Sequence, residues 1–130
     1  MSKGRILIIE DDEEMVALGR LILEKEGYQV LSAYDGPTGL EMLAANPVDL
    51  VLLDIMMNPM DGWEVLERIK ASEQLSHIPV IMLTARHYLE DPPGTEAHAH
   101  QFASYVVKPF VLSNLLGEIR QVLVDSPQDS

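Results

Sequence analysis

The chain has 130 residues, of which 47% are hydrophobic and 23% charged, a balance typical of one globular domain with a single core. Its 21 acidic and 9 basic residues give a formal net charge of −12, which argues against a nucleic-acid or anionic-membrane surface because no basic stripe could neutralise phosphates. The absence of cysteine excludes disulfides and thiolate chemistry. No apolar run approaches the ~20 residues of a membrane span, and no signal-peptide pattern is present, so we expect a cytoplasmic protein.

The first part of the chain alternates strand and helix patterns. Residues 5–9 form a short aliphatic, β-branched run that predicts a strand. Residues 13–26 repeat apolar side chains at helical spacing, and Gly27 is a suitable residue to end that helix. A weaker strand pattern at residues 30–33 is followed by a helical pattern over residues 38–45, directly after a proline.

The same alternation continues through the second part. Residues 49–53 are continuously apolar after Asp49, which is typical of a strand buried on both faces of a parallel sheet. A helix is predicted over residues 63–71, and a second continuous apolar strand over residues 79–83. Residues 104–107 predict a fifth strand, and residues 112–124 predict a final amphipathic helix.

The segment between the fourth and fifth strands breaks the pattern. It carries Pro92, Pro93 and Gly94 at its centre, and a proline inside a regular helix costs about 3 kcal/mol. We therefore expect an irregular fourth helix, and a segment at residues 87–101 that opens locally at low free energy. The whole pattern predicts an α/β fold with a (βα)5 doubly wound parallel sheet, followed by a polar tail at residues 125–130.

Polar residues follow four of the predicted strands at the point where each strand ends. They are Glu10, Asp11 and Asp12 after the first strand, Asp54 after the third, Thr84 after the fourth and Lys108 after the fifth. In an open parallel sheet, the carboxyl ends of the strands meet at one edge, where functional groups gather. The sequence therefore predicts one site that collects carboxylates, a hydroxyl and an ammonium group.

The residue types indicate two kinds of chemistry at that edge. Clustered carboxylates repel one another, and a divalent cation such as Mg²⁺ relieves the repulsion through oxygen ligands. Asp12 and Asp54, helped by Asp11 and a backbone carbonyl just after Asp54, are suitable ligands. A carboxylate can also act as a nucleophile and form an aspartyl phosphate, whose oxygens need cationic and hydrogen-bonding partners. Thr84 and Lys108 can supply those partners.

Four stretches, "ILIIEDDEE", "VDLVLLDIMMNPMDGWEVLERIK", "IPVIMLTA" and "YVVKPF", occur in this order. Together they resemble the receiver domain of two-component response regulators, over residues 4–124. The resemblance implies a flavodoxin-like fold with strand order 2-1-3-4-5, and a signalling domain rather than an enzyme, apart from its own phosphorylation and slow dephosphorylation. It implies a histidine kinase, a phosphotransfer protein or a small phosphodonor as the phosphate source. The signal would pass to a downstream protein or a missing output domain, with no direct nucleic-acid or membrane contact by this domain.

The resemblance also implies roles for the acidic residues. Asp54 is expected to accept the phosphoryl group. Asp11 and Asp12 are expected to hold Mg²⁺, directly or through water, and the backbone carbonyl of Met56 is expected to complete the protein ligands.

The remaining site residues are expected to contact the phosphoryl group and to switch. By the same resemblance, Thr84 and Lys108 contact the phosphoryl oxygens, and Tyr105 moves inward together with Thr84. This movement would change the surface around residues 84–110. The resemblance also implies a cis peptide bond between Lys108 and Pro109.

Other interpretations of these residues stay open. Asp11 and Asp12 could simply stabilise a helix N-terminus, where caps and acids are favoured. The chain could be a non-phosphorylated interaction module of the same fold. It could also be a hydrolase with an aspartyl-phosphate intermediate, but that chemistry needs a second carboxylate two residues after Asp54, where Met56 stands. Asp61 is a plausible start of the third helix in every case.

Overall fold

The computed structural model describes residues 3–84, 102–107 and 112–125. Within these ranges strands and helices alternate along most of the chain. The elements are β1 (Arg5–Ile9), α1 (Glu13–Lys25), β2 (Gln29–Ala33), α2 (Gly36–Ala45), β3 (Leu50–Asp54), α3 (Gly62–Ala71), β4 (Val80–Thr84), β5 (Ser104–Val107) and α4 (Leu112–Asp125). The strands form one parallel sheet in the order β2-β1-β3-β4-β5, so the predicted topology is confirmed.

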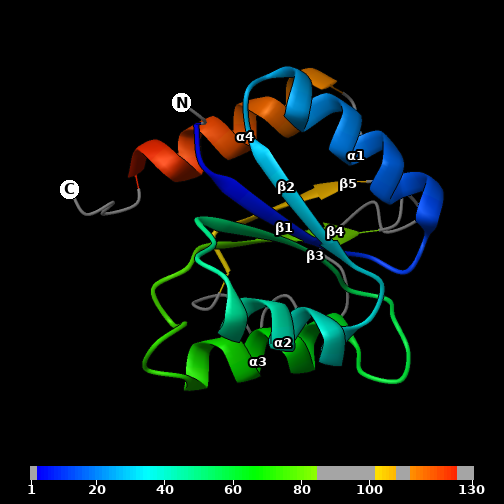
Figure 1. Cartoon of the computed structure of the whole chain (residues 1–130), viewed down its shortest axis with the longest axis vertical. Helices are drawn as coiled ribbons and strands as arrows, with labels where there is room; N and C mark the ends of the chain where they lie inside the picture. The colour runs from blue at the N-terminus through cyan, green and yellow to red at the C-terminus, as the bar shows by residue number, and fades with distance from the viewer. Residues whose placement is uncertain (1–2, 85–101, 108–111, 126–130) are drawn as a thin grey trace.

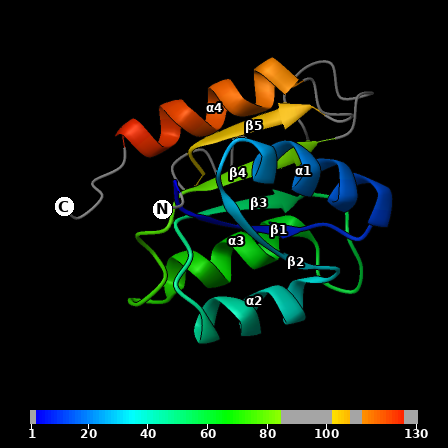
Figure 2. The same cartoon turned by 45° about the horizontal axis from the view of Figure 1, so that its top comes forward.

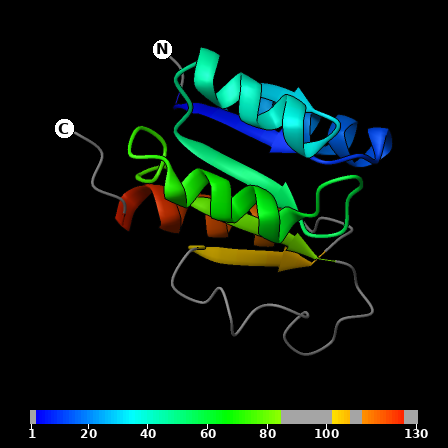
Figure 3. The same ribbon diagram turned by 90° about the horizontal axis from the view of Figure 1, so that it is seen from below.

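The helices cover both faces of this sheet. Helices α1 and α4 lie on one face, and α2 and α3 lie on the other (Figures 1 and 2). Seen from below, α2 and α3 lie in front of the sheet, with the arrowheads of the strands pointing to the same edge (Figure 3). A doubly wound sheet of this kind buries its central strands on both faces and leaves its carboxyl edge open for function.

Side chains from the central strands alternate between two hydrophobic clusters. In β1, Ile6 and Ile8 pack with α1 and α4, whereas Leu7 and Ile9 pack with α2 and α3. The same alternation runs through β3 and β4, because neighbouring side chains of a strand point to opposite faces. All four of these β1 residues are completely buried. The continuous apolar runs of the sequence therefore belong to strands covered on both faces, as predicted.

Aspartate side chains cap the first three helices. Asp12 caps α1, Asp35 caps α2 and Asp61 caps α3. The predicted start of the third helix is confirmed, because Asp61 Oδ1 accepts a backbone N–H of the first turn at 3.0 Å. Helix α2 begins at Gly36, two residues earlier than predicted, because the cap is Asp35 and the proline follows inside the first turn.

Several predictions fall on residues that the structure does not describe. These are the irregular fourth helix, the behaviour of residues 87–101 and the cis bond at Lys108–Pro109. In the described part, the peptide bond between Asn58 and Pro59 is cis. No helix there combines the length and the apolar character that crossing a bilayer requires.

Candidate functional site

Two acidic residues lie side by side where the central strands β1 and β3 end. These strands pair in parallel register, with Ile8 opposite Leu52. Continuing this register by two residues places Glu10 opposite Asp54. Side chains two residues apart share a face of the sheet, so both acids lie on the same face as Ile8 and Leu52, under α1. The pairing of the strands therefore dictates that the two carboxylates meet.

The acids form a compact cluster that reaches the surface. Glu10 is 0% exposed and Asp54 is 2% exposed, whereas Asp11 is exposed. One carboxylate oxygen from each of the three lies within 4.8 Å of the others. Like charges at this spacing repel one another strongly when they are buried, and a divalent cation relieves that repulsion. The three oxygens therefore fit a hard cation, with Asp11 on the solvent side.

The acidic cluster of the structure contains Glu10 and does not contain Asp12. Asp12 was expected to hold the cation with Asp11, but its carboxylate caps α1, with Oδ1 accepting the N–H groups of Glu14 at 2.9 Å and Met15 at 3.3 Å. Glu10, which is not among the predicted ligands, lies in the buried part of the cluster beside Asp54. Its Oε2 accepts the Asp12 N–H at 3.0 Å, which holds the carboxylate beneath the turn. The helix-cap interpretation therefore applies to Asp12.

This assignment of the acids can be tested with two substitutions. We expect Glu10→Gln to weaken Mg²⁺ binding about tenfold or more, because a buried carboxylate at the cation is lost. Asp12→Ser should leave Mg²⁺ binding nearly unchanged, because serine caps a helix about as well as aspartate. Titration calorimetry with Mg²⁺ measures both. If Asp12→Ser weakens binding as much as Glu10→Gln, the cap is not the main role of Asp12.

The loop after Asp54 is held tightly against the end of β3. The Met56 N–H donates to Asp54 Oδ1 at 3.3 Å, and the Gly62 N–H donates to the Ile55 carbonyl at 2.8 Å. A Cβ on Gly62 would overlap the Asp54 carbonyl oxygen and lie 2.7 Å from the Ile55 Cα. Glycine is therefore required where α3 begins, and its absent side chain lets the helix start directly beside the acidic cluster.

Of the remaining predicted site residues, the structure describes the backbone of Thr84 and Tyr105. Thr84 ends β4, where its neighbour Leu83 pairs with Asp54, so the Thr84 backbone reaches the same edge of the sheet. Tyr105 lies in β5, which pairs with β4. The structure describes the backbone but not the side chains of Thr84 and Tyr105, and Lys108 lies outside the described residues. Their roles at the site stay predictions.

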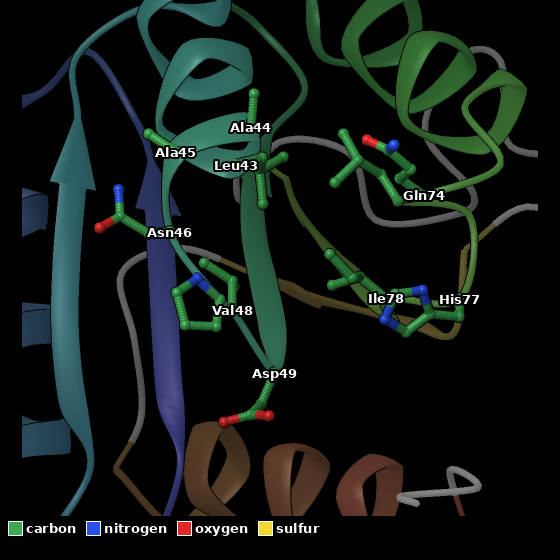
Figure 4. A pocket seen from close by; sticks show the side chains of 11 residues that line it. Leu43, Ala44, Ala45, Asn46, Val48, Asp49, Gln74, His77 and Ile78 are labelled. Atoms are coloured by element: carbon green, nitrogen blue, oxygen red, sulfur yellow. The ribbon is translucent and has the colours of Figure 1, made fainter.

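A hollow at the opposite edge of the sheet includes none of the residues of the acidic cluster in its lining. It has a volume of about 540 Å³ and lies beside the start of β3, between the end of α2 and the α3–β4 connection. Leu43, Val48 and Ile78 line it with apolar groups, and Asp49 and His77 stand at its border (Figure 4). Because parallel strands deliver functional groups at their carboxyl ends, the acidic cluster is the better candidate site.

Comparison with known proteins identifies the family. A family model described as the response regulator receiver domain matches residues 6–120, which is most of the chain. The chain belongs to the response regulator receiver family. Its sheet order and alternating helices are those of the flavodoxin-like receiver fold.

Individual receiver relatives agree with this assignment. The chain is 42% identical over 124 residues to the uncharacterized transcriptional regulatory protein YkoG of Bacillus subtilis (strain 168), covering 95% of this chain and 52% of YkoG. It is 39% identical over 121 residues to the transcriptional regulatory protein CpxR of Escherichia coli (strain K12), covering 92% of this chain and 49% of CpxR. This receiver chain thus spans about half the length of these curated relatives.

A solved structure matches the receiver along nearly its whole length. It is the N-terminal domain of a response regulator receiver protein from Methanoculleus marisnigri JR1, with 42% sequence identity and a TM-score of 0.77. The match covers 94% of this chain and 98% of that one. Receivers of this family are signalling domains rather than classical enzymes.

Proposed function

We propose that this receiver is a phosphoacceptor whose Asp54 carboxylate takes a phosphoryl group from a histidine kinase, a phosphotransfer protein or a small phosphodonor. The observation that carries the proposal is the convergence of Glu10, Asp11 and Asp54 at the carboxyl edge of the sheet. A carboxylate held in such a cluster is positioned both to bind a cation and to act as a nucleophile.

In the proposed transfer, an Asp54 oxygen forms a bond to phosphorus and the bond from phosphorus to the donor's leaving group breaks. The product is an acyl phosphate, and the leaving group departs with the bonding electron pair. Mg²⁺ held by the carboxylates of Glu10, Asp11 and Asp54 and by the Met56 carbonyl would neutralise charge on the transferred group. The Met56 N–H, which donates to Asp54 Oδ1, orients the carboxylate. Thr84 and Lys108 are proposed to contact the phosphoryl oxygens.

Intact-mass measurement after incubation with acetyl phosphate tests this proposal directly. A gain of one phosphoryl group that requires Mg²⁺ is expected. No gain with acetyl phosphate, with Mg²⁺ present and the protein folded, would contradict the proposal.

We expect the phosphoryl group to be long-lived. The residues two positions after Asp54 and after Thr84 are Met56 and Arg86. By resemblance to other receivers, these positions admit and orient the attacking water. A thioether is a poor hydrogen-bond partner, so water should be badly aligned for in-line attack.

Replacing both residues should therefore shorten the lifetime. Met56→Asn with Arg86→Glu should speed phosphate loss about tenfold, because both new side chains can orient water. The decay of phosphorylated protein, followed by mass after removal of the donor, measures the rate. Decay of the double variant at the parent rate would show that these positions do not control the lifetime.

We also propose that phosphorylation changes the surface around residues 84–110. In this switch Thr84 is drawn toward the phosphoryl group and Tyr105 follows into the space that it leaves. Residues 87–101, interrupted by Pro92 and Pro93, should exchange backbone hydrogens quickly in the free protein and more slowly after phosphorylation. Hydrogen exchange on the free and the beryllofluoride-bound protein measures the difference. Identical exchange in both states, or strong protection of the free protein, would contradict the switch.

A further inference from the structure

One methionine differs in exposure from the others that the structure describes. The chain has seven methionines, and the structure describes all of them except Met1. Met56 is 56% exposed, whereas Met57 is 5% and Met82 is 0% exposed. The others are partly buried and pack against the two hydrophobic clusters; they are Met15, Met42 and Met60. Among the described methionines, Met56 is therefore the most accessible to an oxidant dissolved in water.

The exposed methionine lies two residues after the proposed phosphoacceptor. Only Ile55 separates Met56 from Asp54 in sequence, and the Met56 N–H donates to Asp54 Oδ1 at 3.3 Å. Met56 also lines a hollow of about 350 Å³ formed by the β3–α3 loop, together with Asn58, Asp61 and other loop residues. Any change in the polarity of this side chain therefore occurs beside the site, in a space open to water.

We propose that Met56 is a reversible oxidation site that sets the lifetime of the phosphoryl group. Hydrogen peroxide would transfer one oxygen atom to the sulfur lone pair; the O–O bond breaks, the sulfur loses two electrons and water is released. Two thiols would return the sulfoxide to the thioether, forming a disulfide and water. Modification of Met56 stands by itself, whereas its effect on lifetime rests on the proposed function.

The direction of the effect follows from hydrogen bonding. A thioether is a weak acceptor, so the reduced side chain holds water poorly. A sulfoxide oxygen is a strong acceptor on the same flexible stem, and it can hold a water molecule beside the acyl phosphate. Oxidation should therefore shorten the phosphoryl lifetime by about tenfold, less than the 10²–10⁴-fold expected of a fully positioned proton acceptor.

Peptide mapping after brief exposure of the full chain to limiting hydrogen peroxide tests the modification. Fragment spectra of the peptide should show an oxygen atom added to the Met56 sulfur well before one is added to the Met57 sulfur. A methionine sulfoxide reductase with a dithiol should remove this oxygen. Met56→Leu should abolish this early gain, and Met57→Leu should leave it intact. Oxidation of Met57 or Met60 as fast as Met56 would overturn the assignment.

A second measurement tests the effect on signalling. The receiver is oxidised, phosphorylated with acetyl phosphate and followed by mass. Oxidised wild type and oxidised Met57→Leu should lose phosphate about tenfold faster than their reduced forms, and Met56→Leu should show no response to peroxide. Equal lifetimes in oxidised and reduced wild type would overturn the inference while leaving Asp54 phosphorylation established. Failure of the reduced protein to be phosphorylated at all would instead overturn the proposed function, and the lifetime effect with it.

Discussion

Asp54→Asn should abolish the Mg²⁺-dependent gain of a phosphoryl group completely. The amide of asparagine is not a nucleophile toward phosphorus under these conditions, and Asp54 is the only acidic residue between positions 50 and 60. The variant should still fold, because asparagine has nearly the same shape as aspartate and removes a charge from a buried acidic cluster. Intact mass with acetyl phosphate and Mg²⁺ measures the loss.

Asp61→Asn is the matched control for this experiment. Asp61 is an exposed acid in the same loop, and its carboxylate caps α3. Asparagine caps a helix as well as aspartate, so α3 should be retained. The control should be phosphorylated like the wild type. A parental yield in Asp54→Asn would refute the assignment of the acceptor, whereas loss in both variants would indicate a general effect of charge in the loop.

Gly62→Ala should destabilise the domain by about 2–4 kcal/mol, a large effect for one methyl group. The new Cβ would overlap the Asp54 carbonyl oxygen and approach the Ile55 Cα, both of them backbone atoms that cannot rotate away. Relief requires α3 to move away from the end of β3. Urea unfolding measures the loss of stability, and we expect slower phosphorylation because the loop that orients Asp54 shifts.

A second glycine provides the control for this substitution. Gly117 lies inside α4 and is exposed, and a Cβ built there meets nothing within 4 Å. Gly117→Ala should stabilise the domain by about 0.5–1 kcal/mol, because alanine favours a helix interior. Gly62→Ala with wild-type stability would mean that the helix start is not constrained by close backbone approach.

The sequence was sufficient to predict the strands, their order and the position of Asp54 at the end of a strand, because continuous apolar runs end at polar residues at regular intervals. The places of Asp12 as a helix cap and of Glu10 beside Asp54 could also have been predicted. The predicted helix began at residue 13, which makes Asp12 its cap, and alternation from Ile6 and Ile8 places residue 10 on the face shared with Asp54. The position of a residue just before a helix, and the alternation of side chains along a strand, are enough to predict both places.

Other features depend on contacts that no local pattern contains. The requirement for glycine at position 62 arises from the approach of α3 to the backbone of Asp54 and Ile55. The contrast between exposed Met56 and buried Met57 belongs to an irregular loop, where neither helical nor strand periodicity assigns a face. Both features depend on where the β3–α3 loop folds back in three dimensions.

The register between β1 and β3 also links assembly of the site to folding. Glu10 and Asp54 meet only when Ile8 lies opposite Leu52, and a slip by one residue would turn the aliphatic side chains to the wrong faces and separate the acids. A cation site built in this way is absent from the unfolded chain. Any cation that binds there must favour the folded state, by an amount that grows with the logarithm of its concentration. Metal occupancy and conformational stability are thus two readouts of the same strand pairing.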